Sequence, residues 1–195
     1  MRLPIFVLIT LLPFFASAES LAVYSQSVAH LIEPAKLATL GKRGANPRVQ
    51  KAVALLETAR LDGHAVAVVA SNAVFIANYT NKILATLTFD SLTRNHGIAT
   101  KLGTLSDEGL SLMRRGKSPT VQLGPYRNDI LTVDHIVPFA VAPELDLVIA
   151  NLELMPRRLN SSKGAKLGAR QFDYARRFHS VGLISDYRLD QITGG

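Results

Sequence analysis

Residues 133–164 read VDHIVPFAVAPELDLVIANLELMPRRLNSSKG, and this stretch carries the clearest structural signal in the chain. A β-prone run, Ile130 to Val137, leads into it, and Pro138 marks an early end because proline cannot donate a ladder hydrogen bond. Leu152 to Met155 can return as a partner strand, and a helical pattern begins at Arg157. The stretch therefore predicts two strands followed by a helix.

Three polar residues in this stretch combine hard-cation ligands with a basic group. Asp134 and His135 are adjacent, and neighbouring strand residues point to opposite faces, so both can serve one site only if the strand bends or ends there. A carboxylate suits a hard cation such as Mg²⁺. Imidazole, with an unperturbed pKa of about 6.5, suits a general base at neutral pH. Asn160 adds a neutral amide oxygen, which a hard cation also accepts.

The spacing of these residues resembles the HNH nuclease family, also called ββα-metal or His-Me finger nucleases. The family pattern joins an Asp-His pair with following Ile and Pro to an Asn-Leu pair, and then to a second Asn or His before Lys-Gly. Here the matching residues are Asp134-His135-Ile136-Val137-Pro138, Asn151-Leu152, Asn160 and Lys163-Gly164. Asn160 in the final position corresponds to the HNN variant.

The resemblance implies a role for each residue. His135 is expected to be the general base that deprotonates the attacking water, and Asn151 to hydrogen-bond across the hairpin and hold the His135 loop. Asp134 and Asn160 are expected to ligate one divalent metal, and an amide ligand favours Mg²⁺ over Zn²⁺ or Ni²⁺. The remaining candidates are phosphate contacts: Arg157, Arg158 and Lys163.

The activity that the resemblance implies is hydrolysis of phosphodiester bonds in DNA, with RNA as an open alternative. The expected products carry 5′-phosphate and 3′-hydroxyl ends. Two other functions fit the same residues. In the first, an exported nucleic-acid-binding protein keeps an inactive HNH scaffold. In the second, the basic C-terminal part binds an anionic envelope surface or a partner protein.

Positive charge gathers in the C-terminal part of the chain. The whole sequence has 22 Lys and Arg against 15 Asp and Glu, a formal charge of +7. Residues 157–188 alone hold eight basic and two acidic side chains, and their pattern predicts a basic C-terminal helix. A basic surface of this kind fits a polyanion such as nucleic acid. A solvated basic surface without a partner would give the same composition.

The first 18 residues have the layout of a secretory signal peptide. Arg2 supplies the positive end, Leu3 to Phe15 form an apolar run of 13 residues, and Ala16-Ser17-Ala18 offers small residues for cleavage. This run is too short to cross about 30 Å of hydrocarbon. We therefore expect an exported protein, periplasmic or secreted, whose mature chain begins at Glu19 and has no membrane span.

Cysteine is absent from the sequence. The chain therefore has no disulfide and no thiolate zinc site, whereas many HNH proteins carry cysteine pairs around a structural zinc. Stability must come from a packed core, and the chain is long enough to bury one.

The N-terminal region, residues 19–129, is expected to be mostly helical. Asn46 before a proline and Ser106 before an acidic turn are both typical N-caps. Residues 64–89 fit either two short strands around Ser71-Asn72 or a pair of helices, and we favour helices. The predicted fold is α+β, with this region packed beside an HNH module at residues 130–195 that ends in the basic helix.

Overall fold

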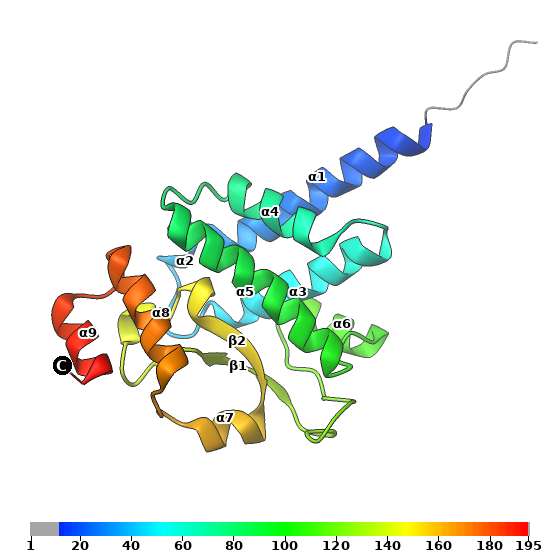
Figure 1. The fold of residues 1–195 in the computed structure, drawn as a ribbon. Coiled ribbons are helices and arrows are strands. Elements are labelled where there is room, and N and C mark those ends of the chain that lie inside the picture. The colour runs from blue at the N-terminus through cyan, green and yellow to red at the C-terminus, as the bar shows by residue number, and fades with distance from the viewer. Residues whose placement is uncertain (1–11, 195) are drawn as a thin grey trace, which may run out of the picture.

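Helices make up most of the structure, a computed structural model that describes residues 12–194 (Figure 1). The described residues also form one two-stranded antiparallel sheet, so the expected α+β class is confirmed. The predicted signal peptide lies partly outside the described residues, and the predicted cleavage site after Ala18 falls within the first helix. None of the helices in residues 12–194 is long and apolar enough to cross a bilayer.

Six helices form the N-terminal part: α1 Leu12–Ile32, α2 Pro34–Leu37, α3 Asn46–Leu61, α4 Val66–Ile76, α5 Lys82–Lys101 and α6 Asp107–Arg114. Helix α1 ends beside Glu33-Pro34, because the residue before a proline avoids the helical region. Residues 64–89, for which we favour helices over strands, hold α4 and the first part of α5. Helix α4 passes through Ser71-Asn72, and α5 then continues without a break to Lys101.

The predicted N-cap at Asn46 is wrong, whereas Ser106 caps α6 as expected. Helix α3 begins one residue earlier than predicted, with Ala45 at the cap position and no side-chain cap. The reason lies in the backbone, because the carbonyl of Ala45 already accepts the N–H groups of Arg48 and Val49. The Oδ1 atom of Asn46 is consequently buried without a hydrogen-bond partner among the described residues.

The sheet pairs β1, Leu131–His135, with β2, Leu152–Pro156. Its register places Asp134 opposite Glu153 and His135 opposite Leu152. The connection between the strands contains two 3-10 turns, η1 Pro143–Leu145 and η2 Ile149–Asn151. Helix α7, Arg157–Lys163, follows β2 directly, so two strands and a helix occur in the predicted order.

The two faces of this hairpin meet different parts of the chain. Alternation along the strands turns Leu131, Leu152 and Leu154 to one face, where they join the core of the N-terminal helices. Asp134 lies on the opposite face, which α7 reaches through Lys163. Residues on both sides of position 130 therefore share one hydrophobic core.

Helix α5 completes the outer edge of β2. The side chain of Asn95 donates from Nδ2 to the carbonyl of Leu152 at 3.0 Å and accepts the N–H of Leu154 at Oδ1, 2.6 Å away. The amide thus makes the two hydrogen bonds that a third strand would make. Ser91, one turn earlier, donates to the carbonyls of Ile149 and Leu152. Both α5 side chains are buried.

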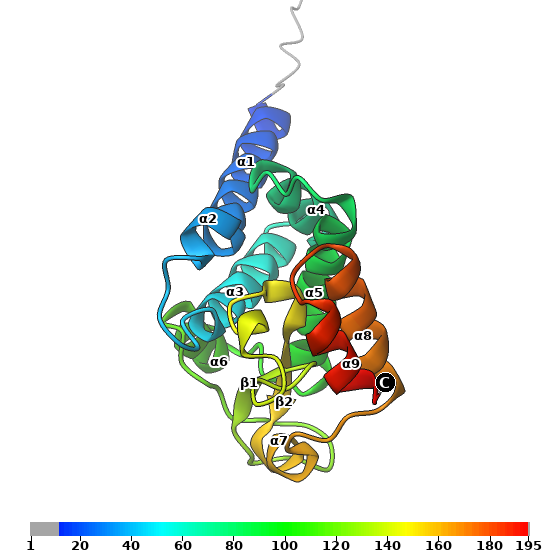
Figure 2. The ribbon, with the colours of Figure 1, turned by 90° about the vertical axis from the view of Figure 1, so that its left-hand side faces the viewer.

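The basic C-terminal segment forms three helices, α7, α8 Ala169–Ser180 and α9 Asp186–Thr193, and α8 carries Arg170, Arg176 and Arg177. Glycines with positive φ cause the breaks, since Gly164 at +55° ends α7 and Gly182 at +76° follows α8. Figure 2 shows α8 and α9 stacked beside the sheet and α5. Phe178 of α8 is fully buried in a second core there.

Replacement of Asn95 with alanine should destabilise the protein by about 2 to 3 kcal/mol. The substitution leaves the buried N–H of Leu154 without an acceptor, and an unsatisfied buried group of this kind costs about 1 to 3 kcal/mol, while the Leu152 carbonyl also loses a donor. Urea unfolding followed by circular dichroism measures the change.

Asn72→Ala in α4 is the matched control, because Asn72 is only partly buried and its side chain has no hydrogen bond in the described structure. Its free energy of unfolding should stay within about 0.5 kcal/mol of the original. Equal losses in the two variants would contradict the edge-closing role of Asn95.

Candidate active site at the strand pair and helix α7

The adjacent residues Asp134 and His135 take different partners at the end of β1. Because the strand ends at His135, the carboxylate faces α7 while the imidazole turns toward the connection between the strands. Lys163 of α7 bridges the two residues, since its Nζ donates to Oδ2 of Asp134 and to the backbone oxygen of His135, each at 2.5 Å. Both predicted residues therefore lie at one end of the hairpin.

Helix α7 presents two candidate residues to one face of β1. Asn160 donates from Nδ2 to the hydroxyl of Thr132 at 3.3 Å, and Lys163 pairs with Asp134. Thr132 and Asp134 are two residues apart on the strand and so share a face. The structure thus brings Asp134, Asn160 and Lys163 to the same side of the sheet.

His135 is held by a residue that sequence reasoning missed. Its Nε2 atom lies 3.0 Å from Oδ1 of Asp146, and both side chains are almost fully buried, with exposed fractions of 5% and 7% for the two residues. An ionised carboxylate only accepts hydrogen bonds, so Nε2 carries the proton and Nδ1 carries the lone pair. Nδ1 has no hydrogen-bond partner among the described residues.

Asn151 is fully buried beneath this loop. Its Oδ1 accepts the N–H of Val137 at 2.8 Å, and its Nδ2 donates to the carbonyls of Val137 at 3.0 Å and Leu145 at 3.5 Å. The amide therefore joins both ends of the segment between His135 and β2. These are the contacts of a positioning residue rather than of one that touches substrate.

Arg157 and Arg158 lie at the start of α7, away from the contacts of His135. Their guanidinium groups are about two-thirds exposed and lie 3.9 and 3.5 Å from the carboxylate of Asp129. That carboxylate also accepts the backbone N–H groups of Arg158 at 2.7 Å and Ile130 at 2.9 Å. The hydrogen bond from Arg158 is the main cause that lowers the pKa of Asp129 below its usual value.

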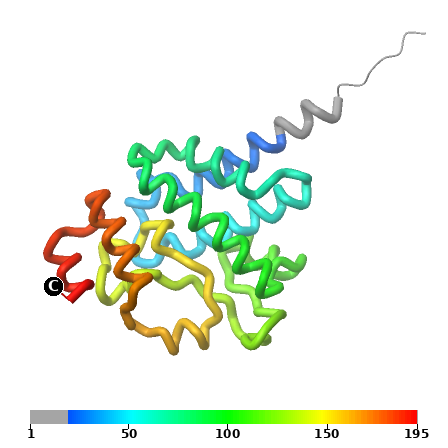
Figure 3. The backbone as a smooth tube through the Cα atoms, in the orientation of Figure 1, coloured from blue at the N-terminus to red at the C-terminus, as the bar shows by residue number. Residues whose placement is uncertain are grey.

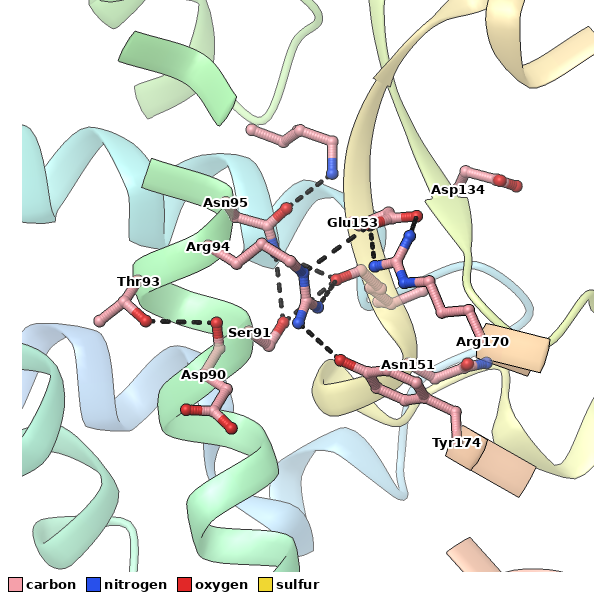
Figure 4. Close-up of polar contacts among 12 residues, drawn as sticks. Asp90, Ser91, Thr93, Arg94, Asn95, Asp134, Asn151, Glu153, Arg170 and Tyr174 are labelled. Carbon is pink, nitrogen blue, oxygen red and sulfur yellow. Dashed lines mark hydrogen bonds and ion pairs between the residues drawn. The ribbon is translucent and has the colours of Figure 1, made fainter. Parts of the chain in front are cut away.

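A second carboxylate, Glu153, shares the sheet face of Asp134 directly across the strand pair (Figure 4). Arg170 of α8 binds it through two hydrogen bonds of 2.9 and 2.6 Å, and these raise the pKa of the guanidinium. Arg94 of α5 lies 3.7 Å from the same carboxylate and donates to the hydroxyl of Tyr174 at 2.9 Å. Glu153 therefore ties α5 and α8 to β2.

Most of the positive charge at residues 157–188 is paired within the protein. Six of the eight basic side chains lie within 4 Å of a carboxylate: Arg157, Arg158, Lys163, Arg170, Arg177 and Arg188. Lys166 and Arg176 form no ion pair with a described residue. The expected outward basic surface is therefore smaller than the sequence count indicates.

The α7 side of the sheet offers two oxygen donors of the kind that a hard divalent cation accepts. Asp134 is 14% exposed at its side chain and already binds a cationic group. The Oδ1 atom of Asn160 remains as an acceptor because Nδ2 faces Thr132. One carboxylate and one amide oxygen, completed by water, suit Mg²⁺. No group of three or more His, Asp or Glu side chains in the described part of the chain is arranged to hold a metal ion.

No model of a protein family matches this chain, and neither a curated protein nor a solved structure is similar enough to match it.

The carboxyl group of Asp129 should make the stability of the protein depend on pH. Its pKa is lowered in the folded protein, so its contribution to stability is present above the unfolded value of about 3.9 and is lost as pH falls through the folded value. Asp129→Asn should therefore lower stability near pH 7, and the deficit should shrink below about pH 4. Thermal unfolding at several pH values measures it.

Asp190→Asn is the control, because Asp190 is exposed in α9 and makes no ion pair with a described residue. It should show no comparable loss at pH 7. A deficit for Asp129→Asn that stays constant down to pH 2 would contradict the pKa argument.

Proposed function

We propose that this protein is a metal-dependent endonuclease of the HNH type that hydrolyses phosphodiester bonds in DNA, outside the cytoplasm. The observation that carries the proposal is the end of β1, where Asp134 pairs with Lys163 of α7, Asn160 lies on the same side of the sheet, and Asp146 holds the ring of His135. Together with the order β1, β2, α7, this geometry supports the function that the motif implies. RNA remains an alternative substrate, because none of these contacts distinguishes the sugar.

His135 has the geometry of a general base. Its Nε2–H donates to Asp146, which fixes the ring, and its Nδ1 lone pair can accept a proton from an attacking water. Asp146 stabilises the imidazolium that forms after the proton transfer. Asn151 holds the loop that carries the ring by bonding both Val137 and Leu145. The base is therefore preorganised by two buried polar residues.

Asp134 and Asn160 would hold one divalent metal, most suitably Mg²⁺, which supplies Lewis-acid stabilisation of the phosphate oxygens and of the leaving oxygen. Lys163 provides positive charge at the same place, so it can contact a phosphate once it leaves Asp134. Arg157 and Arg158 extend from the start of α7 toward solvent and are candidates for contacts with more distant phosphates.

One observation favours a second candidate function, an exported nucleic-acid-binding protein with an inactive HNH scaffold. The ammonium of Lys163 holds the candidate ligand Asp134 through a close ion pair. A metal must therefore compete with this group for the carboxylate. If Lys163 wins that competition under all conditions, binding of nucleic acid would remain without hydrolysis.

Plasmid cleavage by the chain from Glu19 tests the activity. Supercoiled DNA should be nicked or linearised with Mg²⁺ and remain intact with EDTA. His135→Ala should lower the cleavage rate by about 100-fold or more, because general-base catalysis contributes about 10²- to 10⁴-fold.

His179→Ala is the matched control, since His179 lies at the end of α8 and its ring pairs with Asp186. It should cleave like the original protein. No cleavage of DNA or RNA with Mg²⁺, Mn²⁺ or Zn²⁺ would favour the inactive scaffold.

Removal of the Lys163 ammonium should strengthen metal binding at Asp134. Lys163→Met should tighten Mn²⁺ binding roughly three- to tenfold, because the partly buried pair that the metal must break is worth on the order of 1 kcal/mol. Electron paramagnetic resonance of free Mn²⁺ measures the affinity without any turnover.

Lys166→Met removes the same charge from an exposed side chain that forms no ion pair with a described residue, and should change the affinity little. Unchanged Mn²⁺ binding in Lys163→Met, or equal gains in both variants, would contradict the competition.

A further inference from the structure

A basic loop from the N-terminal region lies against the candidate active site. Residues 40–46, LGKRGAN, connect α2 to α3 and are about one hundred positions before the strand connection in sequence. The backbone N–H of Arg43 nevertheless donates to Oδ2 of Asp146 at 2.7 Å. Figure 3 shows this part of the chain, in cyan, passing close to the yellow segment that leads into β2.

The contact connects the loop to the candidate base through one carboxylate. Asp146 receives the Arg43 N–H at Oδ2 and faces Nε2 of His135 with Oδ1. Arg43 adopts a left-handed conformation, with φ at +58°, which is costly for a residue with a side chain. This conformation directs the backbone N–H to Asp146 and leaves the guanidinium exposed.

Lys42 also lies near His135, through the side chain of Phe139. Its Nζ lies 4.4 Å from the centre of the Phe139 ring, and that ring lies 6.0 Å from the ring of His135. The apolar ring therefore separates the ammonium from the imidazole and holds the lysine beside it.

The loop forms a defined, hydrogen-bonded turn. The N–H of Gly44 donates to the carbonyl of Gly41 at 2.9 Å. A Cβ atom at Gly44 would lie 2.8 Å from both that carbonyl oxygen and Cβ of Leu40, so a larger residue does not fit. Ala45, which follows, is fully buried. The two basic side chains are consequently presented from a fixed turn.

The distribution of ion pairs indicates that the ligand of this turn is a polyanion. Neither Lys42 nor Arg43 forms an ion pair with any described residue, and both are exposed. In contrast, six of the eight basic side chains between positions 157 and 188 already face carboxylates. Two cations without ion pairs among the described residues, close to the candidate base, match the place where a phosphodiester strand would pass.

We propose that Lys42 and Arg43 bind phosphate groups of the nucleic-acid substrate next to His135, so that the N-terminal region supplies part of the substrate site. The inference rests on the proposed function, since it names further substrate-binding residues for the same site. The backbone of Arg43 acts separately, as a positioning group for Asp146.

Binding of a fluorescent single-stranded or duplex DNA oligonucleotide in EDTA tests the proposal without any cleavage. The test variant combines Lys42→Ala with Arg43→Gly, because glycine accepts the positive φ and keeps the N–H that Asp146 requires. Its affinity should fall roughly tenfold or more, and the slope of log K against log salt should decrease by about 1.5, which corresponds to two lost phosphate contacts.

Two further variants separate charge from loop structure. Lys42→Arg with Arg43→Lys keeps both charges and should retain most of the affinity and the full slope. Lys82→Ala with Lys101→Ala removes two exposed cations from the two ends of α5 and should change the slope less. Equal slopes for the loop variant and the original protein, or equal losses in the loop and α5 variants, would overturn the proposal.

Plasmid cleavage by the original protein and the loop variant distinguishes this inference from the proposed function. Cleavage by the original chain with unchanged DNA affinity in the loop variant would leave the nuclease standing and overturn the phosphate contacts. Salt-dependent DNA binding that the loop variant loses, without cleavage by the original chain, would support the contacts and overturn the nuclease. No binding of DNA or RNA by the original protein would overturn both.

Discussion

The outer edge of β2 imposes the constraint on which the rest of the structure depends. A two-stranded hairpin alone is marginally stable in water, and its outer edge carries backbone groups that cannot be buried unpaired. The Asn95 amide satisfies the N–H of Leu154 and the carbonyl of Leu152. Helix α5 can therefore lie against the sheet as a third strand would, and the hairpin becomes part of the protein core.

Because the hairpin is fixed at that edge, its two faces can serve different purposes. One face contributes Leu131, Leu152 and Leu154 to the apolar core. The other carries Asp134 and Glu153 directly opposite each other, a like-charge pair that would be destabilising if it were left unpaired. Lys163 and Arg170 neutralise the two carboxylates from α7 and α8. The carboxylates thus determine where both helices pack.

The helices and strands of this region were predictable, because the residues that indicate each element lie within it or next to it. The β-prone run, the returning strand and the helix that starts at Arg157 are all present, as is the cap at Ser106. The N-cap at Asn46 failed because the backbone hydrogen bonds to the carbonyl of Ala45 put Ala45 at the cap position and begin the helix at Asn46. The breaks between the C-terminal helices were not predicted, and glycines with positive φ produce them.

The site itself was only partly accessible from sequence. A motif search identifies Asp134, His135, Asn151, Asn160 and Lys163 by spacing alone, but it cannot identify the partners that reach them from elsewhere. Asp146 carries no motif signal except that it is an acidic residue in an apolar loop. Asn95 and Glu153 resemble ordinary polar residues of a helix and a strand. Their roles depend on which segments meet in three dimensions, and one sequence does not contain that information.

The distribution of charge shows why contacts between distant segments matter for function. A count along the chain assigns nucleic-acid affinity to residues 157–188, yet most of those cations balance carboxylates of the same fold. An ion-paired cation has less capacity to bind phosphate than an unpaired one, because part of its charge is already compensated. The N-terminal turn with Lys42 and Arg43 has lower charge density in sequence, but neither side chain forms an ion pair with a described residue. Attraction for a polyanion should therefore follow the unpaired charge near His135 rather than the density of basic residues along the chain.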